Sequence, residues 1–176
     1  MKKLFLVLVI MTPLFSAFGQ KFGYVDTDYV LSKMPDFQKA QAELNKISKE
    51  WEDEIRQKSK DIEGMYAALK AEEVLLTAEM KTERLEEIKQ EERDLKDYQR
   101  EIFGFEGLFF LKKQELIKPI QDKVFEAVEK VSRANRLSIM FDKAADLVMI
   151  YTDPRFDYTD FVLDELGLGD PNDVLK

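Results

Sequence analysis

The chain has 176 residues, of which 35% are charged and 45% hydrophobic, and its formal net charge is −8. It contains no Cys and no His, which excludes disulfide bonds, Cys nucleophiles, the usual zinc ligands and the commonest general base. The acidic balance argues against nucleic acid as a partner, because that binding depends on neutralising phosphates with Lys and Arg.

The first residues have the organisation of a secretory signal peptide. Two lysines precede an apolar run at 4–11, and small residues stand at Ala17 and Gly19, the positions expected before a cleavage site. We therefore predict a signal peptide at 1–19 and an exported mature chain. An uncleaved anchor is the alternative, although Pro13 interrupts a run that is short for a membrane span.

Residues 21–26 are predicted to form a short strand. The segment KFGYVD alternates and is rich in aromatic and β-branched residues, which is typical of strands. Asp26 and Asp28 follow directly, and short acidic side chains favour the start of a helix, where they accept hydrogen bonds from free N–H groups. We expect these two residues to cap or begin the first helix.

From about 36 to 134 the sequence has the period of a helix. Apolar residues recur at intervals of three and four between charged neighbours, which is the pattern of a coiled-coil seam. The predicted seam residues are Leu44, Ile47, Trp51, Ile55, Ile62, Met65 and Leu69, then Leu85, Ile88, Leu95, Tyr98, Ile102, Phe105, Phe109 and Leu116.

The seam is predicted to fold back on itself near Leu76. Thr77 fits a helix N-cap, and Pro119 is expected to interrupt the returning helix because proline lacks the amide donor. This gives helices at 36–74 and 78–117, each roughly 60 Å long, as an antiparallel hairpin. One uninterrupted helix of roughly 100 residues is the alternative.

After the helical zone, two runs at 137–141 and 147–151 resemble strands and are predicted to pair as a hairpin. A short helix is expected at 159–166, with Gly167 ending it.

Three short strands and two long helices bury too little for a secure core in a single chain. We therefore predict an α+β fold in which a long antiparallel helical hairpin, the coiled-coil arm at 36–117, stands on a small β body. The body, at 20–35 and 118–176, is expected to be completed by oligomerisation. Its candidate assembly residues are Phe22, Tyr24, Val25, Ile139, Phe141, Val148 and Ile150.

The segment IFGFEGLFFL at 102–111 carries more apolar residues than one seam needs. On a helical wheel, Phe103, Phe110 and Ile117 form a second stripe about 100° from the seam. Gly104 is expected to give room to Trp51 on the facing helix, through a closer backbone approach or a slight kink. Pliability of the helix is the alternative, and no role is assigned to Gly107.

The order of these elements resembles the Skp/OmpH family of periplasmic chaperones. The motifs that carry the resemblance are Phe22-Gly23-Tyr24-Val25-Asp26 with Leu31 and Met34-Pro35, and Lys118-Pro119-Ile120 through Val131. The resemblance implies a soluble periplasmic homotrimer whose arms enclose unfolded outer-membrane proteins. The predicted function is an ATP-independent holdase that prevents their aggregation. An envelope coiled-coil spacer or scaffold without chaperone activity is the alternative.

The charge of the arm departs from that family, whose best-known members are basic. Residues 39–101 contain 13 Lys and Arg against 18 Asp and Glu. Lipopolysaccharide or a membrane surface is therefore not expected as a partner.

Five apolar residues are candidates for binding such unfolded clients. They are Phe103, Phe110, Ile117, Tyr66 and Leu75. Contact between subunits is the alternative role for the second stripe, and simple packing of the turn is the alternative for Leu75.

No catalytic, cofactor or metal site is predicted, and the chain is not expected to be an enzyme. The sequence lacks a phosphate-binding glycine loop and a Ser elbow. Asp153, Asp157 and Asp160 lack the ligand spacing of an EF-hand loop.

Overall fold

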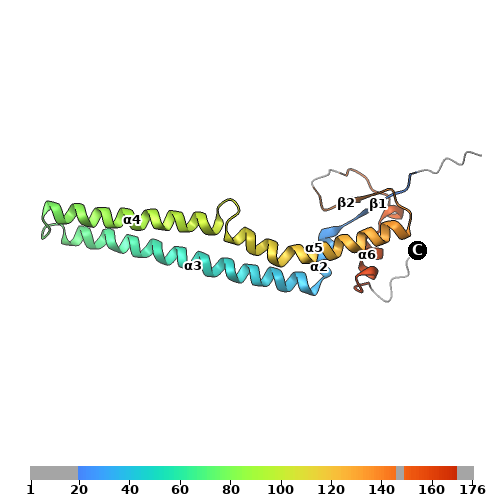
Figure 1. Cartoon of the computed structure of the whole chain (residues 1–176), viewed down its shortest axis with the longest axis horizontal. Helices are drawn as coiled ribbons and strands as arrows, with labels where there is room; N and C mark the ends of the chain where they lie inside the picture. Colours follow the sequence, from blue (N-terminus) through green and yellow to red (C-terminus); the bar gives the residue numbers. More distant parts are fainter. Residues whose placement is uncertain (1–19, 146–148, 170–176) are drawn as a thin grey trace, which may run out of the picture. The chain divides into compact units, whose positions relative to one another are not determined.

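A computed structural model describes residues 20–145 and 149–169 (Figure 1). The predicted signal peptide at 1–19 lies outside the described residues. The chain divides into two compact units. One is Leu31–Val124, and the described part of the other consists of residues 20–30, 125–145 and 149–169. We refer to them as the helical unit and the β unit.

The helical unit contains α3 (Pro35–Glu72), α4 (Ala78–Phe103) and the first part of α5 (Leu108–Ala134). The turn between α3 and α4 excludes one uninterrupted helix. Its last residue, Thr77, accepts a hydrogen bond at Oγ1 from the N–H of Met80 at 3.2 Å. The predicted N-cap is confirmed.

Within the helical unit, α4 lies alongside α3 (Figure 1). Leu44 and Ile62 of α3 are buried, as are Ile88 and Ile102 of α4. These four residues belong to the predicted seam. Their burial follows from the spacing of three and four, which places them on one face of each helix.

The predicted interruption at Pro119 is wrong, because Pro119 lies inside α5. On either side of it, Ile117, Ile120 and Val124 are only 6%, 6% and 3% exposed. A proline inside a helix costs about 3 kcal/mol, whereas burial of three large apolar side chains contributes about 1.5–3 kcal/mol each. Packing therefore outweighs the missing amide donor, and the helix continues.

The β unit is built on a two-stranded parallel sheet of β1 (Phe22–Val25) and β2 (Ile139–Asp142). The register pairs Phe22 with Ile139 and Val25 with Asp142. The predicted strands at 21–26 and 137–141 are confirmed apart from their exact ends. Parallel strands need a long crossover, which the helices between them supply.

The predicted hairpin between 137–141 and 147–151 is wrong. Residues 147–148 lie outside the described residues, and 149–151 do not form a strand. The chain turns away after β2 because the Asp142 carboxylate accepts the N–H of Ala144 at 3.0 Å. The same carboxylate accepts the Thr27 hydroxyl at 2.6 Å. The other edge of β1 is bridged at Tyr24 by Asp157.

Two short helices, α2 (Thr27–Lys33) and α6 (Thr159–Glu165), contribute to the core of the β unit, which includes the buried Val25, Val30 and Val162. The carboxylate of Asp26 accepts the N–H of Tyr29 at 2.9 Å, so its predicted capping role is confirmed. Asp28 lies in the first turn of α2, as predicted.

The predicted C-terminal helix is present as α6, and Gly167 follows its end with a φ of 71°. That left-handed backbone conformation carries no steric cost for glycine. The 3-10 turn η2 (Pro154–Phe156) precedes α6.

Candidate functional site

A four-residue loop at 104–107 separates α4 from α5, and we call it the glycine bulge. Figure 1 shows it standing out from the line of the two helices. Its backbone is hydrogen-bonded: the N–H of Gly104 donates to the carbonyl of Arg100 at 2.8 Å, and the N–H of Gly107 donates to the carbonyl of Gly104 at 3.0 Å. The helix predicted at 78–117 is therefore not continuous, and that prediction is wrong.

Steric crowding explains both glycines of the bulge. A Cβ atom on Gly104 would collide with the carbonyl oxygen of Arg100. A Cβ atom on Gly107 would lie 2.6 Å from the carbonyl oxygen of Ile102 and 2.7 Å from that of Glu101. Crowding by the preceding turn therefore accounts for Gly104, its expected effect on Trp51 stays a prediction, and Gly107 has a structural role.

Phe105 is the most exposed large apolar residue of the helical unit, with 96% of its surface accessible. Its predicted place in the seam is wrong, although it follows the buried Ile102 by three residues. The helix ends at Phe103, so the spacing no longer determines which way the next side chain points. The spacing rule holds only within one continuous helix.

Beside the bulge, three aromatic side chains form a cluster within the helical unit. Trp51 meets Phe103 edge-on with ring centres 6.3 Å apart, and Phe103 meets Phe109 at 5.7 Å. Aromatic pairs at these distances contribute about 0.5–1.5 kcal/mol beyond their buried area. Phe103 nevertheless remains 41% exposed.

The predicted second stripe does not exist as one continuous helical face. Phe103 ends α4 and Phe110 lies in α5, on opposite sides of the bulge. Phe110 is 43% exposed, whereas Ile117 is buried. Of the three stripe residues, two offer apolar surface and Ile117 belongs to the core.

The other two client-binding candidates also lie in the helical unit. Leu75 is 83% exposed in the turn between α3 and α4, next to the exposed Val74. Tyr66 is partly exposed and donates a hydrogen bond from its hydroxyl to Glu92 at 3.1 Å. This bond raises the pKa of the Tyr66 hydroxyl, because loss of the proton would place two negative charges side by side.

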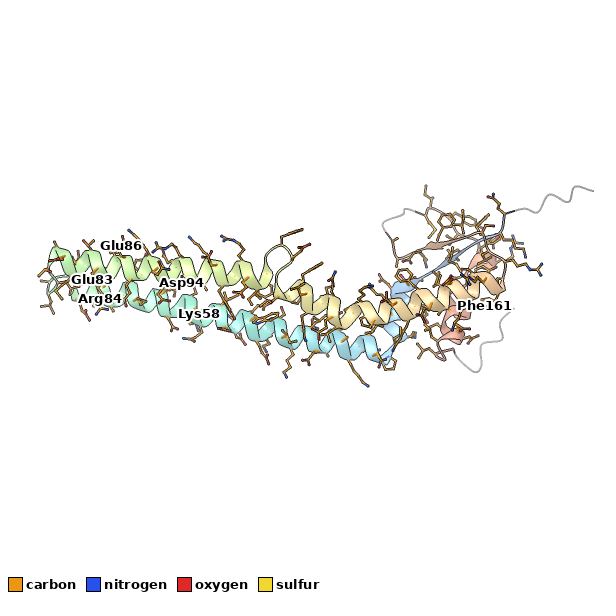
Figure 2. The ribbon with its side chains drawn as sticks, in the orientation of Figure 1. Lys58, Glu83, Arg84, Glu86, Asp94 and Phe161 are labelled. Atoms are coloured by element: carbon orange, nitrogen blue, oxygen red, sulfur yellow. The ribbon has the colours of Figure 1, made fainter. Side chains whose placement is uncertain are left out.

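Charged side chains cover both helices, as the labelled Lys58 on α3 and Glu86 and Asp94 on α4 illustrate (Figure 2). The hydroxyl of Tyr98 donates to Glu54 at 2.6 Å, which raises the pKa of Tyr98 to about 12. Lys89 pairs with Glu86 at 3.0 Å at the surface. Such exposed pairs contribute little to stability, so their main effect is a well-hydrated surface between the apolar residues.

The β unit carries a pocket of about 450 Å³ with mainly apolar walls. Phe22 and Phe156 stack beside one another there, with ring centres 5.0 Å apart. The residues that line it are Phe22, Gly23, Tyr24, Phe141, Met149, Tyr151, Thr152, Asp153 and Phe156.

The assembly candidates separate into buried and exposed groups. Tyr24 and Val25 are buried in the β unit. Val148 lies outside the described residues. The remaining candidates, Phe22, Ile139, Phe141 and Ile150, are exposed by 49%, 49%, 38% and 97%.

Gly23, within the FGYVD motif, is required by a close approach. A Cβ atom at this position would collide with the ring of Tyr158 and lie 3.2 Å from Leu137. This contact is not apparent from the motif itself, because Tyr158 lies far along the chain.

Among residues 20–145 and 149–169, no group of three or more acidic side chains is arranged to hold a metal ion. Asp153 is instead bound by Arg155 at 2.6 Å, which lowers the pKa of Asp153 to about 2. Asp157 accepts the hydroxyl of Thr159 at 2.6 Å. In the same described part of the chain, no helix is both long and apolar enough to cross a membrane.

Comparison with known proteins gives consistent results. Residues 21–166 match the model of the family described as Outer membrane protein (OmpH-like). An uncharacterized protein of Aquifex aeolicus (strain VF5) is 31% identical over 166 residues, covering 94% of this chain and 96% of that protein. A crystal structure from Caulobacter crescentus CB15, described as an OmpH-like outer membrane chaperone, has the same fold. Its TM-score is 0.63 at 15% identity, with 89% of this chain and 88% of that chain covered. The family match covers most of the sequence, and the chain therefore belongs to the OmpH-like outer membrane protein family.

Proposed function

We propose that this protein is an ATP-independent holdase chaperone of the periplasm, which binds unfolded outer-membrane proteins and prevents their aggregation. Family membership supports the proposal. The observation that carries it is the display of large apolar side chains on an otherwise charged helical unit, including Leu75, Phe105 and Phe110. Exposed apolar residues that gather in one stretch mark interaction sites, and residues 103–111 hold five of them: Phe103, Phe105, Leu108, Phe110 and Leu111.

We propose further that α3 and α4 form an antiparallel hairpin, the arm predicted at 36–117. Three contacts support this direction. Trp51 meets Phe103, Glu54 meets Tyr98, and Tyr66 meets Glu92. Partners of successively later residues in α3 come from successively earlier positions in α4, as expected for antiparallel helices. The same proposal includes a β-containing assembly body at 20–35 and 118–176 and a cleaved signal peptide at 1–19.

The β unit is proposed as the assembly body of a homotrimer. Phe22, Ile139, Phe141 and Ile150 present apolar surface that the described residues of one chain leave exposed. The pocket of the β unit adds apolar walls that another copy would cover. Burial of such surface at about 25 cal/mol per Å² provides the driving force for assembly.

Release of the client without ATP follows from the small free energy of each contact. Burial of one large apolar side chain is worth about 1.5–3 kcal/mol, so a few such contacts hold a client reversibly. Phe103, Phe110, Tyr66 and Leu75 are the proposed contacts on the helical unit, with Ile117 supporting them from the core. Neither a cofactor nor a catalytic group is part of the proposal.

The direct test dilutes a urea-unfolded β-barrel protein into buffer with the mature protein and no nucleotide. We expect reduced light scattering at equimolar protein. The matched variant Phe110→Ser removes one exposed apolar side chain and should suppress aggregation less. Scattering that is unchanged even in an excess of wild-type protein would contradict the proposal.

The alternative function is an envelope spacer or scaffold, which the charged, paired helices α3 and α4 favour. A scaffold would bind one folded partner and show no preference for unfolded chains. Comparison of binding to the same β-barrel protein in its unfolded and folded states separates the two functions.

A further inference from the structure

We propose that the glycine bulge is a display element that presents Phe105 as a contact for the apolar side chains of unfolded polypeptides. This inference rests on the proposed holdase function. It adds Phe105, whose spacing predicted a place in the seam, to the residues that contact the client. The observation behind it is that a phenylalanine at seam spacing is 96% exposed on a hydrogen-bonded loop.

The bulge is a defined structure and not a simple fraying of the helix. Gly104 and Gly107 both occupy positions where a Cβ atom would collide with backbone carbonyls. Glu106 adopts a φ of 53°, which costs a non-glycine residue energy. The N–H of Leu111 already donates to the carbonyl of Gly107 at 3.1 Å, so α5 begins at once.

The packing of the seam does not require the bulge. Its four residues, 104–107, correspond closely to one helical turn of 3.6 residues. If they were removed, the buried Ile117 and Ile120 would follow the buried Ile102 by eleven and fourteen positions. That spacing continues the seam. The bulge therefore adds an exposed phenylalanine to a helix pair that would remain in register without it.

The size of the exposed surface favours an extended chain over a second copy of this protein. One phenylalanine buries about 150–250 Å², whereas a stable interface between folded proteins buries about 1,200–2,000 Å². Leu108 and Leu111, which are 41% and 51% exposed, add apolar surface. The total area still falls short of an interface between folded proteins. A single convex side chain suits a transient contact with an unfolded segment.

The side chain of Phe105 determines which residues of an unfolded polypeptide it can bind. Phe105 offers no charge and no hydrogen bond from its side chain, so it favours apolar side chains. Strands of β-barrel membrane proteins alternate apolar and polar residues over about ten positions. In an extended segment of this kind, every second side chain is available to Phe105.

The test measures binding of two fluorescent peptides to the full mature protein. One peptide of about ten residues alternates Phe and Val with Ser, and the other has Ser in place of all apolar residues. Phe105→Ser should weaken binding of the apolar peptide about tenfold. Phe105→Leu keeps an apolar side chain on the same backbone and should stay within about twofold of wild type.

Two further variants control for structure. Deletion of 104–107 should weaken binding as much as Phe105→Ser while preserving helicity by circular dichroism. Phe125→Ser removes another exposed phenylalanine, which is 65% accessible in α5, and should leave peptide affinity unchanged. The sedimentation mass of every variant is measured alongside.

The outcomes separate this inference from the function on which it rests. If wild type binds the apolar peptide and Phe105→Ser binds it equally well, the inference is overturned and the holdase proposal stands. A loss of oligomer mass in Phe105→Ser also overturns it, because the residue is then a contact between copies. If wild type neither binds the apolar peptide nor suppresses aggregation, both proposals fail.

Discussion

At the scale of single residues, glycines mark the places where the backbone of this protein meets other groups most closely. Gly23 lies against the ring of Tyr158, and Gly104 and Gly107 lie against carbonyl groups of the preceding helix. Gly64 in α3 is different, because a Cβ atom there would meet nothing within 4 Å. The sequence shows all four residues but not which of them are sterically required, because the crowding groups depend on the local fold or lie far along the chain.

Gly23→Ala and Gly64→Ala should therefore have opposite effects on the free energy of unfolding. The added methyl at position 23 has to displace an aromatic ring, which costs about 1–3 kcal/mol. The methyl at position 64 improves helix propensity and should stabilise by up to about 1 kcal/mol. Urea unfolding of both variants provides the comparison, and a loss of stability in Gly64→Ala would contradict this account.

Because the Tyr98 hydroxyl donates a hydrogen bond to Glu54, we predict that the folded protein loses stability at alkaline pH. The folded protein raises the pKa of Tyr98 from 10.0 to about 12. The protonated hydroxyl is therefore favoured in the folded state, and its contribution is complete below pH 10. That contribution is lost as the pH rises towards 12.

Tyr98→Phe should remove this part of the alkaline loss of stability. The site is partly exposed, so we expect a difference of no more than about 1 kcal/mol between variant and wild type. Urea unfolding at pH 9 and at about pH 11.5 measures it. An identical pH dependence in the two proteins would show that the bond does not persist in solution.

At the scale of elements, the regular helices and the turn between α3 and α4 were predictable from the sequence, whereas the course of the returning helix at 104–107 and at Pro119 was not. The cap at Thr77 and the buried Leu44 and Ile88 follow from local patterns within continuous helices. The break at 104–107 was missed because Phe105 fits the seam spacing. Pro119 was misinterpreted because the burial of its neighbours is a tertiary effect. The parallel pairing of β1 with β2 joins segments more than 110 residues apart, and no local pattern indicates it.

Pro119→Ala should stabilise the helical unit. Alanine at this position supplies an N–H for the carbonyl of Glu115 and removes the steric conflict of the proline ring. We expect a gain of about 1–3 kcal/mol in the free energy of unfolding. Gln121→Ala, at another exposed position of α5, is the matched control and should change stability by less than about 0.5 kcal/mol. A lower melting temperature for Pro119→Ala would refute this interpretation.

At the scale of the whole molecule, the two units differ in how they expose apolar surface. The helical unit has a narrow core beneath a charged surface with isolated apolar side chains. The β unit has a small sheet, a large apolar pocket and exposed aromatic residues. The sequence predicted that a single chain lacks a sufficient core. Phe22, Ile139 and Ile150 are exposed in the β unit, and completion of the core by other copies stays a prediction. The sequence did not predict the pocket, which is built from residues of three separate segments.

The most direct measurement is sedimentation velocity of the mature protein mixed with a fluorescent, unfolded β-barrel protein in the absence of nucleotide. The account predicts that the protein alone sediments as a trimer and that the label moves with it as one soluble, slightly larger species. If the protein sediments as a stable monomer, or if the label pellets as aggregate while the protein stays behind, the account is contradicted.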